Sequence, residues 1–179
     1  RMIETMAPQA NTRHQFGKPI CSFELIRQKI ARATCTTYLM ESLVYRYAGD
    51  LDANLSEGNA PQAIEELSIE AAVAKVLGSE ALSFVADEAV QIFGGYGFIH
   101  GYMAEQEYRD ARVNRIFEGT NEICRLIIPG TLIKRALSGK VKFMERLGEI
   151  LSGLKTGFAG CGRNDLLGSL IDQVEAVKR

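Results

Sequence analysis

One carboxylate, Glu118, stands at the end of an apolar approach in the segment RIFEGTNEI, residues 115–123. Ile116 and Phe117 precede it and Gly119 follows it. Apolar neighbours that desolvate a carboxylate raise its pKa and make it a stronger base once ionised, which suits abstraction of a proton from carbon. Gly119 would let a ligand come close. An exposed loop glutamate before a helix cap has the same pattern, and the residue types alone favour that simpler interpretation.

The residues after Glu118 favour the start of a helix. Thr120 or Asn121 supplies a capping side chain. The first N–H groups of such a helix have no partner within it, so they are available to hold a polar substrate atom or a phosphate.

A second polar group occurs in the segment NTRHQFGKPI, residues 11–20. Arg13 and Phe16 put a guanidinium and an aromatic ring three residues apart, a pair that could grip a phosphate and an adenine-like ring. The simpler interpretation is a basic helix C-terminus completed by Gly17 and Pro19, and the residue types alone favour it.

Other chemistries lack their motifs. The glycines of GGYGFIHG, residues 94–101, close a helix, whereas a dinucleotide fingerprint opens one after a strand. Neither His14 nor His100 has a glutamate three residues before it, so a di-metal carboxylate bundle is rejected and no metal site is predicted. No Gly-x-Ser-x-Gly elbow supports a hydrolase.

Composition excludes further classes. Hydrophobic residues make up 46% and charged residues 24% of the 179 residues, as in a folded globular protein. A net charge of -1 offers no basic field for nucleic acid. The four cysteines form no C-x-x-C pair, which fits a reducing compartment. The sequence does not start with Met and begins in what resembles the middle of a helical pattern, so we expect a piece of a longer protein.

Apolar spacing predicts an all-α bundle of four or five helices, which we interpret as an antiparallel four-helix bundle with a helical tail. Long helices are expected from Ser22, as the N-cap, to about residue 51, and from Pro61 to a stop at Gly94 and Gly95. Shorter helices are expected over 102–112 and 121–137, the latter interrupted near Pro129. The second long helix should turn the following side chains inward: Ile64, Leu67, Ala71, Ala74, Leu77, Ala81, Val85 and Ile92.

The tail after Leu137 is rich in glycine but keeps a helical apolar stripe over 141–154. That stripe could make peripheral contact with a membrane surface, although packing on the bundle or on another chain is the favoured interpretation. A connector over 156–165 and a last helix over 166–177 complete the expected tail.

Three ordered stretches, RHQFGKPI, AVQIFGGYGF and YRDARVNRIFEGTNEI, resemble the C-terminal helical domain of the acyl-CoA dehydrogenases, from about residue 1 to about 135. The resemblance implies a domain over 1–137, and it implies that 138–179 begins a C-terminal extension like that of the very-long-chain type. Members of this family also have an N-terminal helical domain and a middle β-domain, neither of which is in these 179 residues.

What the resemblance implies is a flavoenzyme of fatty acid β-oxidation that converts acyl-CoA to trans-2-enoyl-CoA. Glu118 matches the family's base, which takes the α-proton while the β-hydrogen leaves as hydride to the flavin. The Glu118 N–H and a flavin ribityl hydroxyl would polarise the thioester carbonyl. Phe117, where many relatives have tyrosine, and Gly119 would line the substrate.

The same matching assigns FAD contacts. Arg13 and Phe16 resemble a pair that touches the FAD of the neighbouring subunit, and Gln91, Gly94 and Gly95 would face its adenosine end. Two further positions resemble residues near the subunit's own FAD: Thr120 and Glu122, the latter a glutamine in some relatives. A homodimer or tetramer follows, with electron-transfer flavoprotein as the electron acceptor.

The resemblance also sets the remaining expectations. The parent protein would work in a bacterial cytoplasm or a mitochondrial matrix, and the isolated piece would bind flavin poorly and turn over nothing. The alternative is a helical scaffold that keeps the dehydrogenase shape without its chemistry. Retention of Glu118, Arg13 and Gln91 argues against that alternative.

Overall fold

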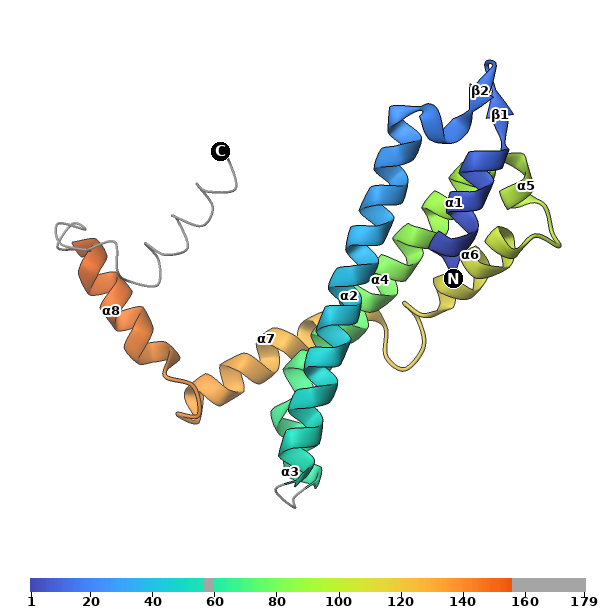
Figure 1. Cartoon of the computed structure of the whole chain (residues 1–179). Coiled ribbons are helices and arrows are strands. Elements are labelled where there is room, and N and C mark those ends of the chain that lie inside the picture. Colours follow the sequence, from blue (N-terminus) through green and yellow to red (C-terminus); the bar gives the residue numbers. More distant parts are fainter. Residues whose placement is uncertain (57–59, 156–179) are drawn as a thin grey trace. The chain divides into compact units, whose positions relative to one another are not determined.

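The described part of the chain is mostly helical, as the sequence predicts. The computed structural model describes residues 1–56 and 60–155 (Figure 1). The helices are α1 (Met2–Thr12), α2 (Glu24–Ser56), α3 (Ala60–Glu66), α4 (Ser68–Phe93), α5 (Gly95–Phe98), α6 (Met103–Val113), α7 (Asn121–Leu137) and α8 (Phe143–Lys155). A short hairpin, β1 (His14–Gln15) and β2 (Lys18–Pro19), and a 3₁₀ turn, η1 (Ile20–Ser22), join α1 to α2. The chain divides into two compact units, Arg1–Thr131 and Leu132–Arg179.

Helix α4 is central to the first unit, where α1, α2, α5 and α6 all pack against it. It runs antiparallel to the long helix α2 (Figure 1). Small side chains at the contacts let the helix backbones approach closely. The main core consists of Met2, Met6, Ala10, Ile20, Ala33, Val85, Ala86, Ala89, Ile92 and Ala111.

The second long helix does not run unbroken from Pro61, as we expected. Leu67 leaves the helical conformation, with φ -91 and ψ 13, and separates α3 from α4. The predicted inner face is also partly wrong, because Ala72, Val76 and Ser79 are buried whereas Leu77 is 43% exposed. A helix that is contacted on several sides buries no single stripe, so its apolar spacing does not define one inner face.

Two other local predictions are corrected. Pro129 lies inside α7 without ending it, because a proline removes one hydrogen bond and bends a helix but need not terminate it. Ser22 does not cap α2: it belongs to η1, and its hydroxyl donates to the Pro19 carbonyl at 2.6 Å.

The segment after α1 is a hairpin rather than a basic helix end. His14 pairs with Pro19 and Gln15 with Lys18 across its two strands. The two turn residues, Phe16 and Gly17, have φ values of 54 and 77. Positive φ at both positions is what a tight two-residue hairpin turn requires, so Gly17 serves this turn and not a helix cap.

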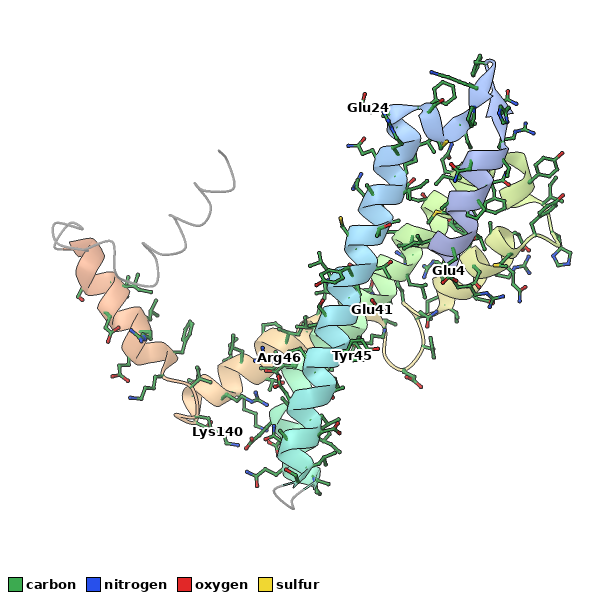
Figure 2. The ribbon with its side chains drawn as sticks, in the orientation of Figure 1. Glu4, Glu24, Glu41, Tyr45, Arg46 and Lys140 are labelled. Carbon is green, nitrogen blue, oxygen red and sulfur yellow. The ribbon has the colours of Figure 1, made fainter. Side chains whose placement is uncertain are left out.

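Helix α2 exposes large apolar side chains along its length. Ala33 is its only buried residue in the part of the chain that the structure describes. Figure 2 shows side chains along its length, with Tyr45 and Arg46 labelled, and the Tyr45 side chain is 75% exposed. Its large exposed apolar residues are Leu25, Tyr38, Leu39, Val44, Tyr45 and Leu55. At 100° per residue these positions are spread around the helix and do not form a single face.

In the second unit, the predicted helical stripe is present as α8, on which Phe143, Ile150 and Leu151 are about half exposed. None of the described helices combines the length and apolarity that a membrane span needs. The connector predicted over 156–165 and the helix over 166–177 lie outside the described residues.

Candidate active site

Glu118 lies in the loop between α6 and α7 with a left-handed backbone. Its φ is 54, and Gly119 after it has φ 87. An L residue rarely adopts this conformation unless its surroundings impose it. Ile116 and Phe117 are 52% and 46% exposed, and Glu118 is exposed as well. The expected desolvation of Glu118 by these two neighbours is therefore not provided within this chain.

The loop presents backbone donors beside the Glu118 carboxylate. Among residues 1–56 and 60–155, no protein acceptor receives the N–H of Glu118, Gly119 or Thr120. Thr120 caps α7, because its hydroxyl accepts the N–H of Ile123 at 3.4 Å. The predicted cap is thus confirmed with Thr120 in that role. The first N–H groups of α7 are not free as expected, because those of Asn121 and Ile123 donate to the Arg115 carbonyl and the Thr120 hydroxyl, so the N–H groups open to a ligand are those of the loop before the helix.

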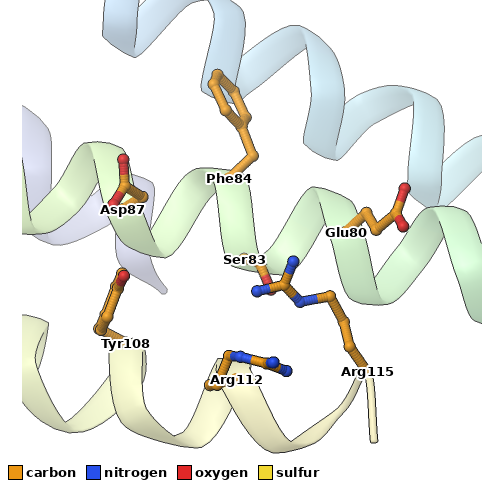
Figure 3. Close-up of a pocket in the computed structure, with 7 residues that line it drawn as sticks. All are labelled: Glu80, Ser83, Phe84, Asp87, Tyr108, Arg112 and Arg115. Atoms are coloured by element: carbon orange, nitrogen blue, oxygen red, sulfur yellow. The ribbon is translucent and has the colours of Figure 1, made fainter. Parts of the chain in front are cut away.

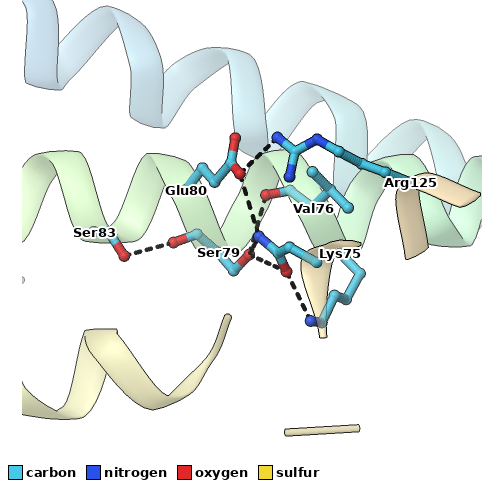
Figure 4. A network of polar contacts seen from close by, with 7 residues as sticks. Lys75, Val76, Ser79, Glu80, Ser83 and Arg125 are labelled. Carbon is cyan, nitrogen blue, oxygen red and sulfur yellow. Dashed lines mark hydrogen bonds and ion pairs between the residues drawn. The ribbon is translucent and has the colours of Figure 1, made fainter. Parts of the chain in front are cut away.

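Asn121 anchors the end of the loop and is 2% exposed. Its backbone N–H donates to the Arg115 carbonyl at 3.1 Å and closes the loop. Its amide oxygen accepts from Lys75 (2.8 Å) and from the Ser79 hydroxyl (3.1 Å). Lys75 also donates to the Gly119 carbonyl at 2.6 Å. Figure 4 shows Lys75 and Ser79 meeting this network from α4.

Sequence reasoning considered Asn121 only as a cap and missed Lys75. The available signal was one lysine in the apolar, alanine-rich stretch AAVAKVLG of α4. An ion pair from Arg125 to Glu80 at 2.6 Å joins α7 to α4 beside the same network (Figure 4). The loop is therefore fastened to α4 on both sides of Thr120.

A cavity of about 420 Å³ lies between α4 and α6 beside this network. The Arg115 guanidinium reaches toward Ser83, Arg112 lies below it on α6, and Glu80 and Asp87 are at the margins (Figure 3). The Arg115 Nε is buried and has no hydrogen-bond partner in the part of the chain that the structure describes. Two guanidinium groups and two carboxylates balance in formal charge, so the cavity has no net charge with which to select an anion.

The residues predicted to contact the FAD of the neighbouring subunit lie toward the other end of α4. Arg13 ends α1 and lines a cavity of about 310 Å³ with Phe93 and Tyr96, which flank Gly94 and Gly95. Gly94, with φ 62, ends α4 as predicted. The remaining predicted residues are exposed, namely Gln91 near the end of α4 and Phe16, 91% exposed, at the hairpin tip.

The structure thus separates the predicted residues into two groups. One is the loop group: Phe117, Glu118, Gly119, Thr120 and Glu122. The other is the hairpin group: Arg13, Phe16, Gln91, Gly94 and Gly95. Helix α4 joins them, and from Ser79 to Gly94 it advances about 22 Å at ~1.5 Å per residue. A small ligand at one group cannot contact the other.

A family model described as acyl-CoA dehydrogenase, C-terminal domain, matches residues 1–132. The chain belongs to the acyl-CoA dehydrogenase family. It is 46% identical over 155 residues to a probable acyl-CoA dehydrogenase of Bacillus subtilis, covering 82% of this chain and 26% of the relative. It is 37% identical over 161 residues to the human mitochondrial very long-chain specific acyl-CoA dehydrogenase, covering 90% of this chain and 22% of that protein.

The fold agrees with that of a solved acyl-CoA dehydrogenase from Bacillus anthracis, crystallised in complex with FAD. The TM-score is 0.83 at 42% identity, over 87% of this chain and 28% of the other. The chain spans about a quarter of the length of these acyl-CoA dehydrogenases.

Glu122, the second residue of α7, has a lowered pKa. Its carboxylate accepts hydrogen bonds from its own backbone N–H and from the Thr120 hydroxyl, and Arg125 and Lys75 add favourable charge. A lowered pKa means that the ionised group stabilises the fold above its ordinary value of 4.5 and that this contribution is lost as the pH falls through the folded value.

We therefore expect Thr120→Val to raise the pKa of Glu122 toward its ordinary value, since the substitution removes one donor to the carboxylate. A ¹³C NMR titration of the glutamate carboxyl carbons measures the change. Thr34→Val, which removes a hydroxyl bonded to the Ile30 carbonyl on α2, serves as the control. An unchanged Glu122 pKa in Thr120→Val would contradict the assignment.

Proposed function

We propose that this chain is the C-terminal helical domain of an FAD-dependent enzyme that converts fatty acyl-CoA to trans-2-enoyl-CoA in β-oxidation. The proposal rests on the backbone conformation of Glu118. Its left-handed turn holds the carboxylate beside backbone N–H groups that have no protein acceptor in the described chain. The family of the chain supplies the reaction class.

In this proposal Glu118 removes the α-proton of the thioester. Its backbone N–H donates to the thioester carbonyl and stabilises the negative charge that develops there as the proton leaves. Gly119 carries no side chain on the approach to the base, and only the Cys124 sulfur, at 4.0 Å, would lie near an added Cβ. The exposed ring of Phe117 offers an apolar surface to the acyl chain.

The hairpin group fits an FAD molecule. The Arg13 guanidinium is exposed and has no hydrogen-bond or ion-pair partner among the described residues, so it is available to a phosphate. Phe16 presents an exposed ring at the hairpin tip, edge-on to Phe23, and the positive φ of Gly94 suits close approach of the backbone to a ligand. When bound, FAD would supply the acceptor for the β-hydrogen, which leaves as hydride.

The loop group and the hairpin group lie at different positions along α4, and this separation supports an FAD site that is shared between two subunits. In a two-fold assembly the hairpin group would contribute to the FAD site of the neighbouring subunit, while the loop group, with Thr120 and Glu122, would serve its own. The exposed apolar side chains of α2 support assembly as a homodimer or tetramer, because a neighbouring chain would remove them from water.

The remaining parts of the proposal concern the setting of the reaction. Electron-transfer flavoprotein would reoxidise the cofactor. A reducing compartment, either a bacterial cytoplasm or a mitochondrial matrix, agrees with the free thiols of Cys21, Cys35 and Cys124. Peripheral membrane contact through the tail stays a prediction.

The direct test uses a full-length protein that contains this chain. We expect it to purify with FAD, to reduce an artificial electron acceptor only when acyl-CoA is added, and to yield an enoyl-CoA two mass units lighter than the substrate. We expect the 179-residue piece alone to show no flavin absorbance after gel filtration. A full-length protein that carries FAD but oxidises no acyl-CoA from four to twenty carbons long would overturn the proposal.

A further inference from the structure

We propose that Lys75 is a positioning residue for Glu118, an inference that rests on the proposed function. The Lys75 ammonium donates to the Gly119 carbonyl at 2.6 Å and to the Asn121 amide oxygen at 2.8 Å. The first of these acceptors belongs to the residue directly after Glu118. Lys75 thereby ties the backbone of the base to α4.

The loop needs such a tie because its conformation is strained and its residues are exposed. Glu118 and Gly119 both have positive φ, and Glu118 pays a steric cost that a glycine would not. The Phe117 ring is about half exposed and does not clamp the loop. Removal of the Lys75 hydrogen bonds would let the backbone relax toward conformations that aim the carboxylate elsewhere.

The hydrogen bonds of Lys75 assign it a geometric role toward Glu118, and its charge acts on Glu122 only from beyond ion-pair distance. No carboxylate oxygen of the described chain lies within 4.0 Å of its ammonium, and both of its acceptors are neutral. Lys75 and Glu118 nevertheless line one cavity of about 250 Å³. The ammonium therefore contacts the backbone from the same cavity that the base borders.

Asn121 and Ser79 hold the other side of this tie. The Asn121 amide donates to the Ser79 hydroxyl at 2.9 Å and accepts from it at 3.1 Å, one turn along α4 from Lys75. Because Asn121 is almost fully buried, its amide oxygen is a fixed acceptor for the lysine. Rigid support of this kind is what keeps a catalytic group within reach of a reacting atom.

The test is Lys75→Met in the full-length, FAD-loaded protein. Methionine keeps much of the length of the side chain but cannot donate. Since small displacements of a catalytic group slow chemistry more than binding, we expect kcat to fall by ~10-fold or more while KM changes by less than about threefold. Because proton abstraction becomes slower relative to the other steps, it determines more of the turnover rate. The kinetic isotope effect on kcat with α-deuterated acyl-CoA should therefore increase. The FAD content should not change.

Lys29→Met is the matched control. Lys29 is also a partly buried lysine that joins two helices, since it donates from α2 to Glu88 of α4 at 2.5 Å, but it does not contact the loop. Its replacement should lower thermal stability without changing the isotope effect. If Lys75→Met retains the kcat of the parent, or loses kcat only in proportion to lost FAD, the inference is wrong.

A second measurement does not depend on activity. In hydrogen exchange, Lys75→Met should speed exchange of the amides of residues 116–120 relative to both the parent and Lys29→Met, and unchanged exchange there would overturn the positioning role. If the methionine variant does not fold, Lys75→Gln, which keeps an N–H donor, is tested in the same way. If the parent protein itself is inactive, the proposed function is contradicted. The hydrogen-exchange measurement then tests the role of Lys75 by itself.

Discussion

Glu118→Gln in the full-length protein is expected to lower acyl-CoA-dependent dye reduction by ~10²-fold or more, because the variant lacks the general base. Glutamine has nearly the same shape as glutamate, so the left-handed turn at residue 118 and the network around Asn121 should persist. FAD content and thermal stability should therefore match those of the parent, and only the chemical step should slow.

Glu24→Gln gives a matched control for this experiment, since Glu24 is an exposed glutamate in the first turn of α2. It should leave activity unchanged. A loss of only a few-fold in Glu118→Gln would mean that the base lies elsewhere, or that the domain is a scaffold that has kept the fold without the reaction.

Arg13→Ala is expected to weaken FAD binding by about 10- to 100-fold. A hydrogen bond to a charged partner contributes ~1.5–3 kcal/mol, and the Arg13 guanidinium is exposed with no competing partner in the described chain. Quenching of flavin fluorescence as apoprotein is added measures the dissociation constant. The turnover rate at saturating FAD should change little, because Arg13 does not border the loop of Glu118.

Arg46→Ala is the control for Arg13, because Arg46 is an exposed arginine on α2 that pairs only locally, with Asp50. It should bind FAD as the parent does. If both arginine variants bind FAD equally well, the assignment of the hairpin group to the cofactor is wrong.

Much of the fold could be predicted because its signals are local. Recurring apolar residues predict α2, and the glycine pair after Phe93 marks the end of α4. The break at Leu67 could not be predicted, since leucine is a good helix former and the sequence there contains no glycine or proline. The hairpin was missed because an aromatic residue, Phe16, occupies a turn position that glycine or asparagine usually fills.

The site residues that lie within one segment of the sequence were predicted. The contacts between segments that are distant in the sequence were missed. Glu118, Gly119 and Thr120 are adjacent, and the cap by Thr120 follows from the residue type. The tie from Lys75 to Gly119 spans 44 residues and has no local pattern. Exposure of the loop was also misjudged, because neighbouring apolar residues bury a carboxylate only when something else packs over them.

The central helix α4 also restricts how the length of the domain can vary. Each residue inserted between Ser79 and Gly94 would turn the hairpin group by about 100° around the α4 axis relative to the loop of Glu118, at 3.6 residues per turn. Insertions and deletions compatible with both sites should therefore fall outside this stretch, whereas substitutions on its outer face leave the register intact.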